Sequence, residues 1–326
     1  MLRPVGMTTL LLTRSEVERA LDVPALAGAL RAAFAAYSTD DGARALRVRA
    51  SLPGPGTATV LFPGVVAGVP AYTVKVHAKF PAERPAIRGV LCLHDVETGA
   101  LLAVMDSTHL TAVRTGLAGA LAAHTLARAD ADTVAIVGAG VQGEHQLRAL
   151  SRLRPLRRVR AYDTDPARSA AYATRMRAEL SVDVDAAPTL DSAVRDAGVI
   201  LAATWARAPF LFPAMLRPGT HVTTLGPDEP GKCEVSADVL RSALFVCDDR
   251  ALAVQMGAAG GAGLGAEAIG AELGDIFAGR HPGRTSPEQT TVYGGVGVAF
   301  QDLVVAWQAY QAARTSGAGR TIDFLA

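Results

Sequence analysis

The segment 133–143 has the residue spacing with the clearest chemical meaning in this sequence. It reads TVAIVGAGVQG, in which a β-branched run ends in a Gly-x-Gly-x-x-Gly pattern and a helical pattern follows at once. The first glycine permits a tight turn from strand to helix, the second lets the backbone approach a pyrophosphate, and the third allows close helix–strand packing. Phosphates would then lie on the free N–H groups of the new helix. The segment predicts dinucleotide binding, with these candidate contacts: Gly138, Gly140, Val141, Gln142 and Gly143.

Asp163 follows these glycines at the spacing of a ribose-binding carboxylate. It ends the predicted strand 159–162, twenty residues after the last glycine, where a second strand presents an acid to the ribose 2′-hydroxyl. Because Thr164 rather than an arginine follows it, the sequence favours NAD over NADP. Thr204 ends a later predicted strand, 199–204, and is a further candidate for binding the cofactor.

Two cationic side chains stand in apolar surroundings and are candidates for binding an anion. Arg114 is the only charged residue between Asp106 and Arg128, and a guanidinium cannot be buried without a partner. It could fork onto a substrate carboxylate, pair with a structural carboxylate or reach the surface, and its sequence context leaves these open. Lys75 lies in the otherwise apolar stretch 72–76 of the predicted strand 71–79, where a lysine most often faces water from an edge strand.

Asp228 and Arg49 are weaker candidates when judged on the residues alone. Asp228 follows the predicted strand 220–225 in the string GPDEPG. Ligands of open α/β sheets bind at the carboxyl ends of strands, so this carboxylate could act as an acid or base. Asp-x-Pro-Gly is also ordinary turn chemistry, which the string by itself favours. Arg49 belongs to an alternating row of arginines on the predicted strand 44–52, and such a row is usually a solvated face.

Composition narrows the class of protein and its partners. The chain has 326 residues, of which 50% are hydrophobic, and Lys+Arg 32 against Asp+Glu 31 give a net charge of +1. Nothing in that balance favours nucleic acid or an anionic membrane as a partner. No long apolar run or signal pattern is present. The three cysteines are widely spaced and form no metal-ligand pattern, so we expect core thiols, a reducing cytoplasmic location and no metal.

The hydrophobic pattern predicts two kinds of architecture in one chain. From residue 133 onward strands and helices alternate, which predicts an α/β fold with a doubly wound parallel Rossmann sheet. The first third alternates like an antiparallel sheet with flanking helices, an α+β unit. A last helix, 298–313, is apolar on one face and is expected to pack back against the first domain.

Several of the candidates lie inside longer strings that resemble the ornithine cyclodeaminase/μ-crystallin family. The strings are distributed over nearly the whole chain and are specific as a set, although each is short. They are 97–106, 110–116, 138–142, 218–222, 226–232 and 279–284.

The resemblance implies a domain plan and a set of residue roles. A substrate-binding and dimerisation domain would be formed by both termini, residues 1–120 and 298–326, around a dinucleotide-binding Rossmann domain at 121–297. Family members act on α-amino or α-imino acids with NAD(P), usually as homodimers. The residues that match by position are Arg49, Lys75 and Arg114 as the carboxylate-holding cations, and Asp228, with Lys75, as the catalytic group.

Two departures from the family bear on function. Ornithine cyclodeaminases carry a glutamate for the distal amine where this chain has Val60, which favours a less cationic substrate. The expected activity is NAD-dependent hydride transfer at the substrate α-carbon, by a cyclodeaminase, a ketimine reductase or an amino-acid dehydrogenase. The alternative is a protein that binds NAD(P)H and a small ligand without turnover, as in μ-crystallin. The altered string YGGVG at 293–297 is its best support, and retention of Asp228 with the three cations argues against it.

Overall fold

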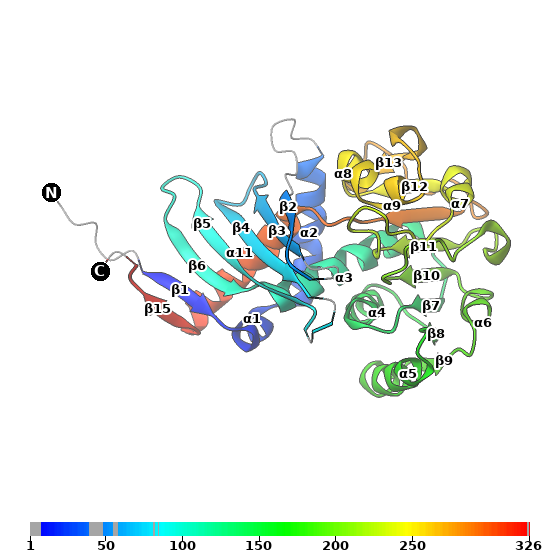
Figure 1. Ribbon diagram of the computed structural model, residues 1–326, viewed down its shortest axis with the longest axis horizontal. Coiled ribbons are helices and arrows are strands. Elements are labelled where there is room, and N and C mark those ends of the chain that lie inside the picture. The colour runs from blue at the N-terminus through cyan, green and yellow to red at the C-terminus, as the bar shows by residue number, and fades with distance from the viewer. Residues whose placement is uncertain (1–7, 39–47, 55–57, 81, 84, 325) are drawn as a thin grey trace. The chain divides into compact units, whose positions relative to one another are not determined.

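The chain divides into two compact units, each with its own sheet (Figure 1). The computed structural model describes residues 8–38, 48–54, 58–80, 82–83, 85–324 and 326. Unit 1 comprises Met1–Arg114 and Val298–Ala326, and unit 2 comprises Thr115–Gly297. The first boundary lies inside helix α3 (Ser107–Leu126), where no change of composition marks it, whereas the sequence analysis placed it at 120/121.

Unit 1 is built on a seven-stranded sheet in the order β15-β1-β6-β5-β4-β3-β2. Neighbours from β2 to β6 are antiparallel, whereas β1 is parallel to β6 and antiparallel to β15. Strands from the two ends of the chain therefore pair in one sheet. The strands are β1 Thr9–Leu12, β2 Val48–Ser51, β3 Ala58–Gly64, β4 Ala71–Lys79, β5 Ile87–Asp95, β6 Leu101–Asp106 and β15 Arg320–Ile322; the part of the predicted strand 44–52 before Val48 lies outside the described residues.

Helix α11 (Ala299–Ser316) packs on one face of this sheet, behind the strands in Figure 1, and α1 (Arg14–Ala20) and α2 (Val23–Tyr37) pack against α11. The Asp22 side chain caps α2 by accepting the Ala25 N–H, and a proline occupies the first turn, as helix starts require. Phe300 of α11 packs edge-on against Phe34 of α2, with ring centroids 5.0 Å apart. The last helix thus packs within the first domain, as the sequence indicated.

Strand β4 has its polar side chains on the buried face and its apolar side chains on the outer face, the opposite of an ordinary surface strand. Its inward residues are Thr73, Lys75, His77 and Lys79, which are all buried. The residues between them are mostly apolar and point to the outer face, where Val76 is 40% exposed. Polar groups therefore point toward the helices, and apolar groups point away from them.

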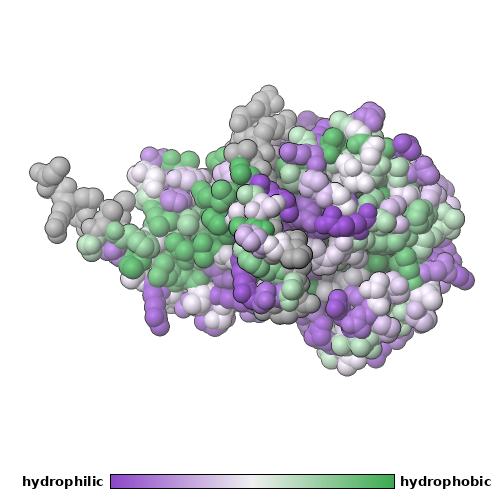
Figure 2. Space-filling view, in the orientation of Figure 1, coloured by the Kyte–Doolittle hydropathy of each residue, from purple (hydrophilic) through white to green (hydrophobic). Residues whose placement is uncertain are grey.

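The outer face of the sheet carries a straight row of apolar side chains across four strands. Val48 pairs with Leu61, Leu61 with Val76, and Val76 with Val90. All four are exposed, by 48%, 38%, 40% and 45% respectively, and Figure 2 shows hydrophobic residues gathered on this face of unit 1. Paired residues on one face lie within contact distance of each other, so the row is a continuous apolar surface.

Unit 2 is an eight-stranded sheet in the order β13-β12-β14-β11-β10-β7-β8-β9, with every pair parallel. The predicted doubly wound parallel sheet is confirmed. The direction of winding changes between β7 and β10, and such switch points bind ligands. Its strands are β7 Thr133–Val137, β8 Arg158–Tyr162, β9 Asp183–Ala186, β10 Val199–Ala202, β11 His221–Thr224, β12 Leu244–Cys247, β13 Ala271–Glu272 and β14 Thr291–Gly294.

Helices connect these strands, as parallel pairing requires. They are α4 Val141–Leu153, α5 Pro166–Leu180, α6 Leu190–Val194, α7 Ala237–Ser242, α8 Arg250–Gln255, α9 Ala258–Gly261 and α10 Leu273–Phe277, with short 3₁₀ turns η1 Pro213–Met215 and η2 Ala266–Ala268. Within the described part of the chain, no helix combines the length and apolar character needed to cross a membrane.

Candidate nucleotide and substrate-binding sites

The glycine turn between β7 and α4 has the geometry that a pyrophosphate needs. Gly138 has φ +99°, and a Cβ on it would lie 2.5 Å from the Ala203 carbonyl oxygen; a Cβ on Gly143 would lie 2.5 Å from the Gly138 oxygen. By contrast, a Cβ on Gly140 would meet nothing within 4 Å, and Gly140 is the uncapped N-terminus of α4. Gly138 and Gly143 are therefore needed for close packing, whereas Gly140 leaves the free N–H groups of the helix open to a ligand.

Gln142, in the first turn of α4, supports the same interpretation. Its side-chain Oε1 is buried and has no hydrogen-bond partner among the described residues. A buried polar atom without a partner is costly unless a ligand or water satisfies it. The residues of the turn therefore fit a dinucleotide.

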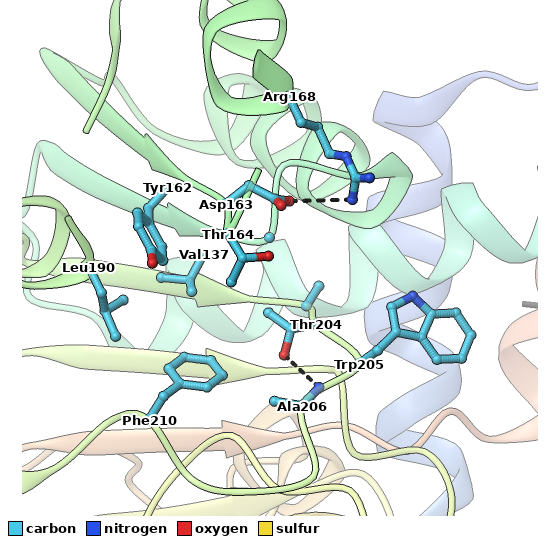
Figure 3. A pocket seen from close by; sticks show the side chains of 13 residues that line it. Val137, Tyr162, Asp163, Thr164, Arg168, Leu190, Thr204, Trp205, Ala206 and Phe210 are labelled. Atoms are coloured by element: carbon cyan, nitrogen blue, oxygen red, sulfur yellow. Dashed lines mark hydrogen bonds and ion pairs between the residues drawn. The ribbon is translucent and has the colours of Figure 1, made fainter. Parts of the chain in front are cut away.

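A cavity of ≈ 420 Å³ lies at the carboxyl ends of β7, β8 and β10 (Figure 3). This volume lies in the range of small-molecule and cofactor sites. The walls are mostly apolar, with a few polar groups from the ends of the strands. The lining residues are Val137, Gly138, Gly140, Tyr162, Asp163, Thr164, Arg168, Leu190, Ala203, Thr204, Trp205, Ala206 and Phe210.

Asp163 is fixed in the wall of this cavity. One carboxylate oxygen accepts the Ala139 N–H at 3.0 Å, and the other accepts the Asp165 N–H at 3.1 Å. An Arg168 nitrogen lies 3.7 Å from the first of these oxygens, and Figure 3 shows the two side chains facing each other. The carboxylate thus links the glycine turn to the end of β8, which is where a ribose-binding acid belongs.

Thr204 is held by a buried carboxylate that the sequence analysis did not single out. Glu234 accepts the Thr204 N–H and hydroxyl at 2.5 and 2.7 Å through one oxygen, and the Thr224 hydroxyl and Gly226 N–H at 2.6 and 3.1 Å through the other. Burial raises the pKa of Glu234, although these hydrogen bonds act against that rise. One side chain therefore fixes the loop after β10 against the loop after β11.

Asp228 lies in the loop after β11, a little beyond Gly226. Its Oδ1 accepts a hydrogen bond of 2.7 Å from the Lys232 ammonium, and its side chain is 26% exposed. Lys232 itself is buried. The carboxylate is thus partly open to solvent and has a cation beside it.

In unit 1, Lys75 and Arg114 converge on Asp302 of α11. Lys75 Nζ lies 2.5 Å from one Asp302 oxygen, and Arg114 Nε lies 3.0 Å from the other. Lys75 is fully buried and β4 has neighbours on both sides, so the interpretation as an edge-strand lysine facing water is wrong. Burial alone would raise the pKa of Asp302, but Arg114 and Lys75 hold it below its ordinary value. Two cations share one anion, which leaves a net positive charge for a monoanionic ligand.

His77 adds a neutral polar group beside this cluster. Its ring nitrogen Nε2 lies 2.9 Å from the Ser107 hydroxyl. Burial, followed by the positive charge of Lys75, lowers the pKa of His77 to about 2, so the ring carries no charge near neutral pH.

Comparison with known proteins assigns the chain to a family. Residues 7–317 match the model of the ornithine cyclodeaminase/mu-crystallin family. The chain belongs to this family. A relative in sequence is the alanine dehydrogenase of Archaeoglobus fulgidus, 30% identical over 98% of this chain and 99% of that protein.

Solved structures of family members have the same fold over the full length. An archaeal alanine dehydrogenase dimer with bound NAD is 30% identical, with a TM-score of 0.91 over 98% of this chain and 100% of that one. A Δ1-pyrroline-2-carboxylate reductase from Thermococcus litoralis, in complex with NADH and L-proline, is 27% identical, with a TM-score of 0.91 over 96% and 100% of the two chains. The predicted family, enzyme class and NAD cofactor are confirmed.

The site residues expected from the family resemblance fall into two groups. Lys75 and Arg114 are brought together in unit 1. Arg49 of β2 pairs in register with Val60 and so shares the inner face of the sheet with them. Asp228 belongs to unit 2 with the cofactor-binding candidates.

Asp302, His77 and Glu234 are polar residues at these sites that the sequence analysis missed. Asp302 had a readable signal, since it is the only acidic residue in α11. His77 alternates with Lys75 along β4, which also places it on the same face. Glu234 had no signal in its local sequence, because its partners come from two separate loops.

Proposed function

We propose that this chain is an NAD-dependent reductase or dehydrogenase of a small α-imino or α-amino acid whose side chain carries no second amine. Asp302 is the only acidic side chain among the described buried residues of unit 1. Both of its oxygens already accept hydrogen bonds, from Lys75 and Arg114. A buried distal ammonium needs a carboxylate partner, and the described residues of this face have no buried carboxylate to spare. That observation carries the proposal.

Val60 supports it from the neighbouring strand. Its side chain is 1% exposed and packs with Phe62 and Ala299. The Phe62 ring also lies under the Lys75 ammonium, with Nζ 4.3 Å from the ring centroid. The surroundings of the cations are therefore apolar where ornithine cyclodeaminases carry a glutamate.

The residue roles follow from this chemistry. Lys75 and Arg114 bind the substrate carboxylate, and Arg49 contributes from the same face of the sheet. The glycine turn, Asp163 and Thr204 hold NAD, which accepts a hydride from the substrate α-carbon or donates one to it. Asp228 exchanges a proton with the substrate nitrogen. Orientation of the substrate by its carboxylate contributes to the rate because it converts a two-body encounter into a positioned one.

A paired assay tests this function. The purified protein is given NAD with alanine, proline or pipecolate, and separately with ornithine or lysine, while NADH formation and ammonia release are followed together. We expect NADH from a substrate of the first group. Ammonia from ornithine without net NADH would show a cyclodeaminase and overturn the proposal. If neither NADH nor ammonia formed while the protein still bound NADH, the result would support the non-catalytic alternative.

The assembly proposed for the chain is a homodimer formed through the outer face of the unit 1 sheet. The row Val48–Leu61–Val76–Val90 is exposed and contiguous, and exposed patches of this kind usually mark interaction surfaces. The proposed location is the cytoplasm, because the three cysteines, Cys92, Cys233 and Cys247, are free and free thiols are characteristic of reducing compartments.

A further inference from the structure

The loops that follow β10 and β11 are joined along their length. The Cys233 N–H donates to the Ala206 carbonyl oxygen at 3.0 Å, and an Arg207 nitrogen lies 3.6 Å from a Glu229 oxygen. The loop that lines the nucleotide cavity and the loop that carries Asp228 therefore form one local structure.

Lys232 lies at the centre of this structure. Its Nζ is 2.7 Å from Asp228 Oδ1, 3.8 Å from Glu229 Oε1 and 4.1 Å from the centroid of the Trp205 ring. Its side chain is 4% exposed. A buried ammonium is held by such carboxylates and by the face of an aromatic ring.

The choice of lysine at this position is informative. The chain has three lysines and 29 arginines, so arginine is its ordinary cation. All three lysines, Lys75, Lys79 and Lys232, are buried, by contrast with most of the arginines. An ammonium is a compact point charge, whereas a guanidinium is a broad planar fork. A compact ammonium thus suits a buried position between two carboxylates and an indole ring.

Trp205 covers this ammonium and also borders the nucleotide cavity. Trp205 is 54% exposed, and Figure 3 shows its side chain beside Thr204 and Ala206 at the edge of the cavity. The indole therefore lies between solvent and the Lys232 ammonium.

We propose that Lys232 is a positioning residue that fixes the Asp228 carboxylate for proton exchange, and that Trp205 shields the Lys232 ammonium of this ion pair from water. The proposal rests on the proposed role of Asp228. Lys232 touches neither cofactor nor substrate in this scheme, so its loss lowers turnover and leaves the cofactor affinity unchanged.

The first experiment separates turnover from cofactor binding. Lys232→Met removes the charge at similar length. We expect kcat to fall by about 100-fold, the loss typical of a misplaced reacting group. The Kd for NADH should stay within about threefold of the wild-type value, since the mutation acts on the transition state alone. Wild-type kcat in this variant would overturn the proposal, and so would a lowered kcat that only follows a lost affinity for NADH.

Chemical rescue distinguishes positioning from a structural role. In Lys232→Ala, added propylammonium should restore part of kcat in the amino-acid oxidation direction, because a small cation can occupy the vacated space beside Asp228. Asp228→Asn is the matched control, and the amine should not rescue it. No rescue of Lys232→Ala would overturn the role of the ammonium. Full turnover by Asp228→Asn would instead overturn the role of Asp228 in the proposed function.

A pair of variants at Trp205 tests the shielding. Trp205→Phe keeps an aromatic face over the ammonium, and Trp205→Leu removes it. At saturating NAD, kcat of the leucine variant should fall more steeply as the salt concentration rises, because salt screens a more exposed ion pair more strongly than a less exposed one. The phenylalanine variant should follow the wild type. Equal salt dependence of the two variants would overturn the shielding.

Discussion

Asp302 shows, at the scale of a residue, why Lys75 and Arg114 can be buried together. Each cation would be costly alone in the core of unit 1, and one carboxylate compensates both through separate oxygens. Gln301 also accepts a hydrogen bond of 2.9 Å from Arg114. The cations are therefore held in place before a substrate arrives, and the net charge of the cluster still favours an anion.

Removal of the Asp302 charge should destabilise the fold strongly. Asp302→Asn leaves two buried cations without an anion, so we expect a loss of about 3–5 kcal/mol in the free energy of unfolding, the usual result of breaking a buried pair. Urea denaturation measures it. The matched control is Glu83→Gln, whose partner Arg88 is exposed like itself and for which a loss of at most about 1 kcal/mol is expected. Equal losses in the two variants would contradict the cluster's role.

The strands and helices differ in how far the sequence could predict them. The turn from β7 to α4 depends on residues that are close in the sequence, so its glycines alone were sufficient to predict it. The alternation of side chains along β4 was also visible in the sequence. Which face of the strand is buried could not be predicted, because the more polar face of a strand usually meets water. Asp302, which makes the inward face of β4 favourable for Lys75, comes more than two hundred residues later. Local patterns could not supply that partner. The family resemblance assigned Lys75 to the carboxylate-holding residues, but it did not point to Asp302.

The apolar outer face of β4 leads to a prediction about assembly. Val76→Glu places a charge in the middle of the outer apolar row and should dissociate the proposed dimer. The mass in solution, measured by light scattering, should then approach the 33.7 kDa of one chain. Val96→Glu is the control, since Val96 is 47% exposed and lies outside the row. A monomeric wild type, or a Val76→Glu variant that remains dimeric, would contradict this interface.

A pH dependence follows from the pairing of β11 with β14. His221 is fully buried between the Thr291 and Thr223 hydroxyls, at 2.8 and 2.9 Å. Burial, with Arg284 and Arg154, lowers the pKa of His221 to about 3 from 6.5. Between these values the unfolded chain binds the extra proton, so stability falls as the pH falls from 6.5 toward 3, by up to ~1.4 kcal/mol per pH unit.

The slope of stability against pH tests this assignment. Urea denaturation at several pH values in this window should give a shallower slope for His221→Gln than for the wild type, whatever the absolute stability of the variant. His77 contributes a dependence of the same sign because its pKa is also lowered, to about 2, so part of the slope should remain. An unchanged slope in His221→Gln would contradict the assignment.

At the scale of the whole molecule, the chain passes between its two units twice, and each passage brings a member of the buried cluster of Lys75, Arg114 and Asp302. Arg114 is the last residue of the first segment of unit 1, and it lies within α3, which continues into unit 2. The second passage is at Gly297–Val298, and Asp302 follows in the first turns of α11. The Arg114–Asp302 pair therefore ties together the two points where the chain enters and leaves unit 1.

The proposed function assigns the substrate carboxylate to residues of unit 1 and NAD to residues of unit 2. It therefore predicts that binding of the amino acid and binding of the cofactor can be lost separately. Arg114→Ala should lower kcat/KM for the amino acid by about 10²–10³-fold, as expected when one partner of a buried charge pair is lost, while the Kd for NADH stays near that of the wild type. Gly138→Val should instead raise the Kd for NADH, because the φ of +99° at Gly138 and the nearby Ala203 carbonyl leave no room for a side chain in the glycine turn. Fluorescence titration with NADH and initial rates measure the two effects, and Arg114→Lys controls for the loss of charge. If Arg114→Ala lost NADH binding while its fold remained intact, its assignment to the substrate carboxylate would be wrong, and the two units would not carry separate functions.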